Sequence, residues 1–143
     1  MFRGLMTEEQ KKAFLAMAVK VVMADGKVVP EEGALMDLLL HEFGGKHLAS
    51  GNEIMGKPNM AVFTDRRSQV ICLMELFVLA FSDKRLAIQE VEVLIQEIAS
   101  EFDLSDKDIR AIHDWAVRQA PLSLEAWGIM TDQDPNLKDW VNY

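Results

Sequence analysis

The sequence contains one pattern twice: an apolar helical segment, a short acidic turn and a second apolar segment. In each copy an aspartate ends the first segment and a glutamate lies in the first turn of the second. Three pairs of equivalent positions are each 58 residues apart: Asp25 and Asp83, Val28 and Leu86, and Glu32 and Glu90. A pair of amphipathic helices cannot bury its apolar face alone, so the two copies should pack against each other. The duplication therefore predicts one helical bundle.

Apolar residues recur at helical spacing through most of the chain, and no stretch shows sustained strand alternation. We therefore predict an all-α fold, a compact helical bundle built from two pseudo-repeats. The bundle is expected to form a single domain over residues 1–143. Its parts, in order, are a first repeat over about 7–44, a connecting loop over 44–63, a second repeat over about 64–103 and C-terminal helices over 105–143.

Local signals predict where individual helices begin and end. Thr7 and Gln10 match a capping box, in which each side chain accepts from the other's backbone N–H, and Ser105 and Asp108 repeat the pattern. Because proline lacks a backbone N–H, Pro121 is expected to close the helix that Ser105 begins, with a short last helix after it. Three helices are each predicted to bury one apolar face, formed by Phe14, Leu15, Ala18, Val21 and Val22; by Val70, Leu73, Met74, Phe77, Val78 and Phe81; and by Val91, Leu94, Ile95, Ile98 and Phe102.

Net charge limits the classes of partner. The 143 residues carry a formal net charge of −8, whereas nucleic acids and anionic membranes attract clustered Lys and Arg. We therefore expect no nucleic-acid partner and no adsorption to anionic membranes. The most apolar helical candidate, AFLAMAVKVVMA, carries Lys20 and is too short to span a bilayer, so no membrane insertion is expected. The N-terminal MFRGLMTEEQ turns acidic before the apolar core of a signal peptide could form, so a cytoplasmic location is expected. The single cysteine, Cys72, lies among apolar neighbours and is expected to be buried and unreactive.

The acidic turns resemble part of a calcium-binding loop, but an EF-hand ending at Glu32 would need oxygen ligands where Val21 and Met23 stand. Two explanations of the acidic residues stay open. In the first, the side chains cap helix ends. In the second, packing of the repeats gathers carboxylates that bind Mg²⁺, Ca²⁺ or Mn²⁺. The candidate ligands are Asp25, Glu32, Asp83 and Glu90, with Glu31 as an accessory.

No catalytic motif is apparent. GNEIMGKP at 51–58 has the G-x-x-x-x-G-K pattern of a phosphate-binding loop, but Pro58 replaces the Ser or Thr that would hold Mg²⁺. The histidines form no metal-binding or nucleophile-activating pattern and are expected at surface or boundary positions; they are His41, His47 and His113. We therefore predict that the chain is not an enzyme, with a metal-assisted hydrolase as the minor alternative.

Two stretches resemble the repeat signatures of the TerB-like family, named for a tellurite-resistance protein: MADGKVVPEE at 23–32 and LMELFVLAFSDKRLAIQEVEVLIQEIASEFDLS at 73–105. The resemblance covers roughly residues 7–118. It implies a bundle of about seven helices with internal pseudo-symmetry. It also implies a non-catalytic role in bacterial stress and tellurite resistance, or in DnaJ-type co-chaperones, and metal binding at Asp25 and Glu32 together with Asp83 and Glu90.

The expected function is accordingly a non-enzymatic, cytoplasmic TerB-like module associated with stress or tellurite resistance, with a divalent metal at its acidic turns. The alternative is a purely scaffolding module that binds a protein partner or self-associates and holds no metal. That alternative predicts an apolar surface patch near the 44–63 loop or the C-terminal tryptophans. Trp115 is expected in the core, whereas Trp140 is open between the core and a partner contact.

Overall fold

The computed structural model describes residues 2–22, 56–82 and 88–131. They form four α-helices and two short 3₁₀ turns, and this part of the chain contains no strand. The all-α prediction is therefore confirmed. The prediction of about seven helices also includes segments that lie outside the described residues. The elements are η1 (Arg3–Leu5), α1 (Glu8–Val22), η3 (Met60–Val62), α4 (Arg66–Ser82), α5 (Ile88–Ser100) and α6 (Asp106–Thr131).

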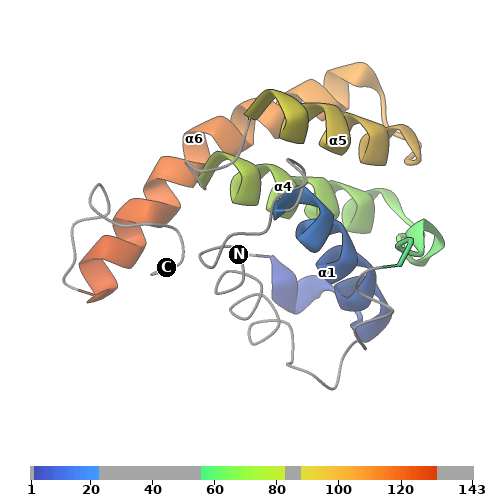
Figure 1. The fold of residues 1–143 in the computed structure, drawn as a ribbon, viewed down its shortest axis with the longest axis horizontal. Helices are drawn as coiled ribbons and strands as arrows, with labels where there is room; N and C mark the ends of the chain where they lie inside the picture. The colour runs from blue at the N-terminus through green and yellow to red at the C-terminus, as the bar shows by residue number, and fades with distance from the viewer. Residues whose placement is uncertain (1, 23–55, 83–87, 132–143) are drawn as a thin grey trace.

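Helix α4 lies in the middle of the described bundle, with α1 on one side and α5 and α6 on the other (Figure 1). In α4, the side chains of Leu73, Leu76 and Phe77 have no exposed surface. The helix is buried on nearly all sides, because Ile71, Cys72, Leu79 and Ala80 are also buried. Helix α1 is buried without interruption from Ala13 to Val19. The prediction of a single apolar face was therefore too narrow for these two helices, since a helix surrounded by others is apolar on all sides.

Helix α1 begins as its sequence predicts. The Thr7 backbone N–H donates to Gln10 Oε1 at 3.0 Å, and the Gln10 N–H donates to Thr7 Oγ1 at 3.2 Å. The Gln10 amide also donates to the Val62 carbonyl at 3.1 Å. One side chain thus caps α1 and ties it to η3, which precedes α4.

The starts of α4 and α6 are joined by a charged pair. The predicted Ser105–Asp108 capping box is present, since the Asp108 N–H donates to Ser105 Oγ at 3.1 Å. Arg66, the first residue of α4, donates to both oxygens of Asp108 at 2.9 and 3.1 Å. Hydrogen bonds from Arg66, and then from Ser105, hold the pKa of the Asp108 carboxyl well below its usual range.

A third capping box, which the sequence reasoning missed, starts α4. The Ser68 N–H donates to Asp65 Oδ1 at 2.8 Å, and the Asp65 N–H donates to Ser68 Oγ at 3.4 Å. The helix therefore begins at Arg66. The Asp-x-x-Ser spacing carries the signal, with serine in the place that Glu or Gln more often fills.

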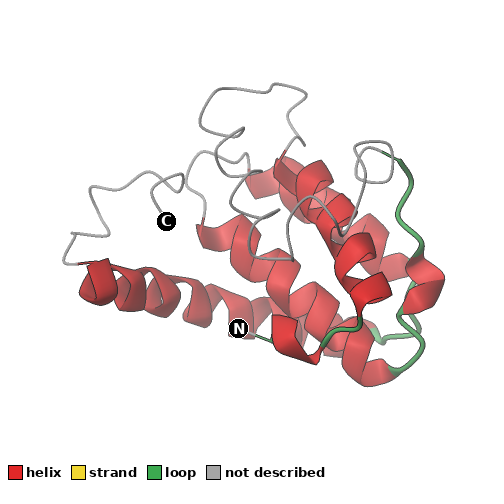
Figure 2. Ribbon diagram, turned by 90° about the horizontal axis from the view of Figure 1, so that it is seen from below, coloured by secondary structure: helices red, strands yellow, loops and turns green. Residues whose placement is uncertain are grey.

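The prediction that Pro121 ends a helix is wrong. Helix α6 runs without a break from Asp106 to Thr131, with Pro121 inside it. Pro121 is exposed, so its ring meets no neighbouring helix, and the cost of the proline is confined to α6 itself: the lost bond to the Val117 carbonyl and the contact of the ring with the preceding turn. Figure 2 shows the second half of α6 extending past the ends of the other described helices.

The two remaining sequence predictions about the core concern Cys72 and Trp115. Cys72 is fully buried with Met17 Sδ 3.9 Å from its sulfur, and burial raises the pKa of its thiol far above the ordinary value. Such a thiol is not a nucleophile at neutral pH, as predicted. Trp115 is half-buried, packs against the core and lies 6.0 Å from the Phe2 ring between centroids. Trp140 lies outside the described residues.

Candidate functional site

The predicted metal ligands are described only in part. Glu90 is exposed in the first turn of α5, where it meets water. The other candidates lie outside the described residues: Asp25, Glu31, Glu32 and Asp83. Among the described residues no three or more His, Cys, Asp or Glu side chains are grouped so as to hold a metal ion. The convergence of the two acidic turns therefore stays a prediction.

The helix ends that border the two acidic turns do lie on one side of the bundle. Figure 1 shows α1 and α4 ending, and α5 beginning, toward the same side. Ser82, the last residue of α4, is buried, and its Oγ has no hydrogen-bond partner in the described part of the chain. A buried hydroxyl without a partner costs free energy unless another group binds it. A hard oxygen next to Asp83 fits the donor set that Mg²⁺, Ca²⁺ or Mn²⁺ prefers.

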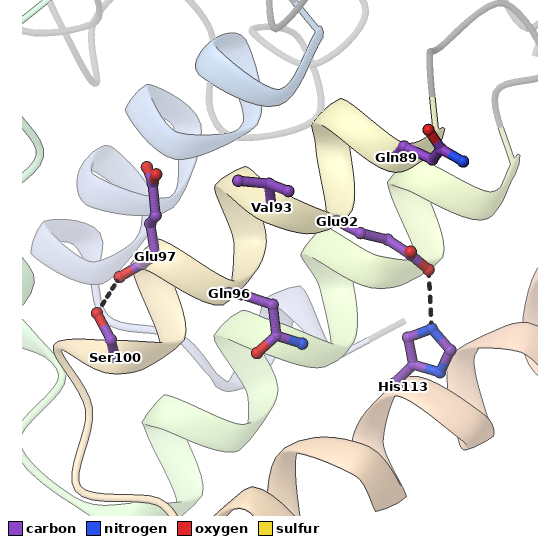
Figure 3. A pocket seen from close by; sticks show the side chains of 7 residues that line it. All are labelled: Gln89, Glu92, Val93, Gln96, Glu97, Ser100 and His113. Carbon is purple, nitrogen blue, oxygen red and sulfur yellow. Dashed lines mark hydrogen bonds and ion pairs between the residues drawn. The ribbon is translucent and has the colours of Figure 1, made fainter.

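A second candidate site is a hollow of about 680 Å³ over α5, with His113 of α6 at its border (Figure 3). One face of α5 supplies the other lining residues, because they recur at helical spacing. Glu92 and Glu97 give this hollow its acidic character, and Val93 is its exposed apolar side chain. The full lining is Gln89, Glu92, Val93, Gln96, Glu97, Ser100 and His113.

His113 lies where three helices meet. Its Nε2 is 3.0 Å from Glu92 Oε1 on α5, and its Nδ1 is 3.2 Å from Asp114 Oδ1 on α6. The rings of Phe77 and Phe81 on α4 are nearly perpendicular to the imidazole, at 5.4 and 5.1 Å between centroids. His113 was expected at a surface or boundary position, and it is half-buried at the edge of the core.

The electrostatic surroundings of His113 favour its charged form. Burial lowers the pKa of the imidazole, but hydrogen bonds to Glu92 and Asp114 and the charges of both carboxylates together outweigh it. The resulting pKa of His113 is raised above the ordinary value of 6.5. The imidazole is therefore positioned to carry a proton close to neutral pH.

This hollow does not assemble a nucleophile. Ser100 lies eight residues after Glu92 on the same helix, a rise of about 12 Å along the axis. Its hydroxyl donates instead to the Glu97 backbone carbonyl at 2.6 Å, as the dashed line in Figure 3 marks. The imidazole and the hydroxyl are thus too far apart for the base to activate the hydroxyl, which requires hydrogen-bond distance.

A third feature is an exposed apolar stripe on the second half of α6. Leu122, Ile129 and Met130 are 56%, 77% and 71% exposed, and Ala126 between them is exposed as well. The spacing of these four residues, i, i+4, i+7 and i+8, places them on one face of the helix. We name Leu122, Ala126, Ile129 and Met130 the α6 stripe.

Neither the Glu92–His113 pair nor the set of residues in the α6 stripe was named from the sequence, although the scaffolding alternative expected an apolar patch near the C-terminal tryptophans. Glu92 and His113 are 21 residues apart, and no local pattern pairs them. The four residues of the α6 stripe all follow Pro121, within the short last helix that the sequence predicts, and their exposure depends on what packs against that helix rather than on their spacing.

Comparisons with known protein families, with curated proteins and with solved structures give no match for this chain. None of the described helices is both long enough and apolar enough to span a bilayer.

Proposed function

We propose that this chain is a non-enzymatic TerB-like module of stress or tellurite resistance that acts in the cytoplasm by self-association, through the α6 stripe. The observation that carries the proposal is the exposure of Leu122, Ile129 and Met130 on one helix face. Contiguous exposed apolar residues of this kind are typical of protein interaction sites. The family and the stress role rest on the sequence signatures at 23–32 and 73–105, together with the proposed arrangement of about seven helices in two pseudo-repeats.

The occupant that fits the stripe best is a second copy of the same chain. Two antiparallel α6 helices related by a two-fold axis near Ala126 would place Leu122 of each copy beside Met130 of the other. A small residue at the crossing point lets two helices approach closely, and larger apolar side chains on both sides fill the space. A two-fold interface needs such a self-complementary patch. The stripe is short, so the proposed dimer is weak and depends on concentration.

Replacing Ile129 with glutamate should weaken this dimer at least about tenfold, because the change removes a buried apolar contact and places two like charges near the axis. Sedimentation equilibrium over a range of concentrations measures the dissociation constant. Val93→Glu is the matched control: Val93 is 60% exposed, and it lies on α5 away from the stripe. This control should leave the constant unchanged.

Two results would contradict self-association through the stripe. The first is a chain that sediments as a monomer at its highest soluble concentration. The second is an equal loss of association in Val93→Glu and Ile129→Glu, which would indicate an effect of added charge on the whole molecule.

A second candidate function is divalent-ion binding at the acidic turns, with Asp25, Glu32, Asp83 and Glu90 as ligands and Glu31 as an accessory. It is supported by the shared side on which α1 and α4 end and α5 begins, and by the buried Ser82 hydroxyl, which has no hydrogen-bond partner among the described residues. The ion would hold two helix-to-helix turns together. The purely scaffolding alternative holds no ion there.

Calorimetric titration with Mg²⁺, Ca²⁺ and Mn²⁺, accompanied by thermal melting, separates these two alternatives. A bound ion stabilises the folded chain by about 2.7 kcal/mol at a hundredfold excess over its dissociation constant. The double variant Asp25→Asn with Asp83→Asn should lose this stabilisation, whereas Asp103→Asn, on an exposed residue outside the turns, should keep it. Absence of heat and of any melting shift with all three ions supports the scaffolding alternative.

A further inference from the structure

We propose that His113 is a proton-operated clamp between α5 and α6, closed when the imidazole carries two N–H groups and loosened when it carries one. This clamp is independent of the proposed self-association and of the metal site.

The geometry of the ring nitrogens carries this inference. Nε2 faces a carboxylate oxygen of Glu92 at 3.0 Å, and Nδ1 faces a carboxylate oxygen of Asp114 at 3.2 Å. A neutral imidazole has a single N–H, so it donates to one carboxylate and turns a lone pair toward the other. Only the imidazolium donates to both at once. The placement of a carboxylate oxygen at each ring nitrogen therefore fits the charged ring better than the neutral one.

The position of His113 makes the proton matter to three helices. The Phe77 and Phe81 rings of α4 pack nearly perpendicular to the imidazole, and Glu92 reaches it from α5. Among the described residues, the charged groups facing the ring are Glu92 from α5 and Asp114 from α6, while α4 presents these two phenylalanines. Both facing charges are negative, so each favours the proton, and the loss of the proton weakens the contact between α5 and α6.

The hollow over α5 changes with the same proton. Its ionisable lining groups are Glu92, Glu97 and His113. With the imidazole charged, the positive ring offsets one carboxylate. With the ring neutral, the two glutamates face the solvent uncompensated, and the hollow becomes more attractive to a cation. The protonation of His113 thus determines how strongly α5, which lines the hollow, is held against α6, and it also determines the net charge of the hollow.

The direction of the pH dependence follows from the raised pKa of His113. A histidine whose pKa is higher in the folded chain than in the unfolded one stabilises the fold fully below the unfolded value near 6.5. That contribution disappears as the pH rises through the folded pKa. We therefore expect α5 to be held more firmly at pH 6 than at pH 8.

Hydrogen exchange with mass spectrometry on peptides covering α5 tests the clamp at these two pH values. After correction for intrinsic exchange rates, the protection of α5 should be about three- to tenfold higher at pH 6 than at pH 8, the range expected for one charge-assisted hydrogen bond. Glu92→Gln should abolish the difference, and in the same variant NMR of the imidazole signals should show a lower His113 pKa. Glu92 is partly exposed, so glutamine fits its place without disturbing the core.

Glu97→Gln is the matched control, because Glu97 lies on the same helix and lines the same hollow without a hydrogen bond from its side chain to His113. It should keep the full difference between pH 6 and pH 8. Equal pH dependence in the unaltered chain and Glu92→Gln overturns the clamp, as does the absence of any pH dependence in the unaltered chain. A loss of the pH dependence in Glu97→Gln equal to that in Glu92→Gln also overturns it, since that result would assign the effect to the charge of the hollow as a whole.

Discussion

Replacing Phe77 with alanine should lower the free energy of unfolding by about 3–5 kcal/mol, the largest effect expected for a single substitution in this chain. Phe77 is fully buried in the second half of α4. Its ring stacks on Phe81, 6.0 Å away between centroids, and contacts His113. Alanine removes the apolar area and leaves a cavity between helices that cannot close completely. Chemical denaturation followed by circular dichroism measures the change.

Val93→Ala provides the comparison for Phe77→Ala. Val93 is 60% exposed on α5, so its truncation should change the free energy of unfolding by no more than about 0.5 kcal/mol. A Phe77→Ala variant that unfolds at the same denaturant concentration as the unaltered chain would contradict the placement of α4 at the centre of the bundle.

Replacing Pro121 with alanine should stabilise the second half of α6 by up to about 3 kcal/mol, the cost of a proline inside a helix. Alanine restores the N–H that donates to the Val117 carbonyl, and it removes the clash of the ring with the preceding turn. Since Pro121 is exposed, no buried contact is lost in exchange. Hydrogen exchange over residues 121–131 should slow at least about tenfold, which corresponds to about 1.4 kcal/mol.

Glu125→Ala, in the same exposed segment, controls for the gain of an alanine alone. It replaces a residue that already has a good helix propensity, so its exchange should slow by much less than tenfold. Equal protection in Pro121→Ala and the unaltered chain would contradict a continuous α6, because a helix interrupted at residue 121 has no bond for the new N–H to restore.

The sequence predicted those parts of the fold that are encoded locally. The capping boxes at Thr7 and Ser105 depend on residues three positions apart, and both are present as expected. The apolar positions Val91, Ile95 and Ile98 of α5 recur at helical spacing, and they are buried. The inert character of Cys72 followed from its neighbours in the chain, and burial confirms it.

The parts that the sequence could not predict depend on what packs around each residue. The breadth of burial on α1 and α4 reflects the number of neighbouring helices, which one helix's periodicity does not specify. Pro121 was predicted to end a helix from its lack of an N–H alone, but its exposed position makes the missing hydrogen bond tolerable inside α6. The pairing of His113 with Glu92 joins two helices and has no signature in either. The acidic turns were singled out by repetition, and the convergence of Asp25 with Asp83 stays a prediction.

The pair between Arg66 and Asp108 has a consequence for the way the two longest described helices lie together. Helices α4 and α6 run in the same direction in Figure 1, and the salt bridge joins their first turns. Each peptide dipole points along its axis, so two parallel helices bring two partial positive charges to one place, where they repel. The Asp108 carboxylate lies at that meeting point, where it accepts from the Ser105 N–H at the start of α6 and binds the Arg66 side chain of α4. A substitution of the polar residues in the first turn of either helix should therefore also change the electrostatic stability of the first turn of the other.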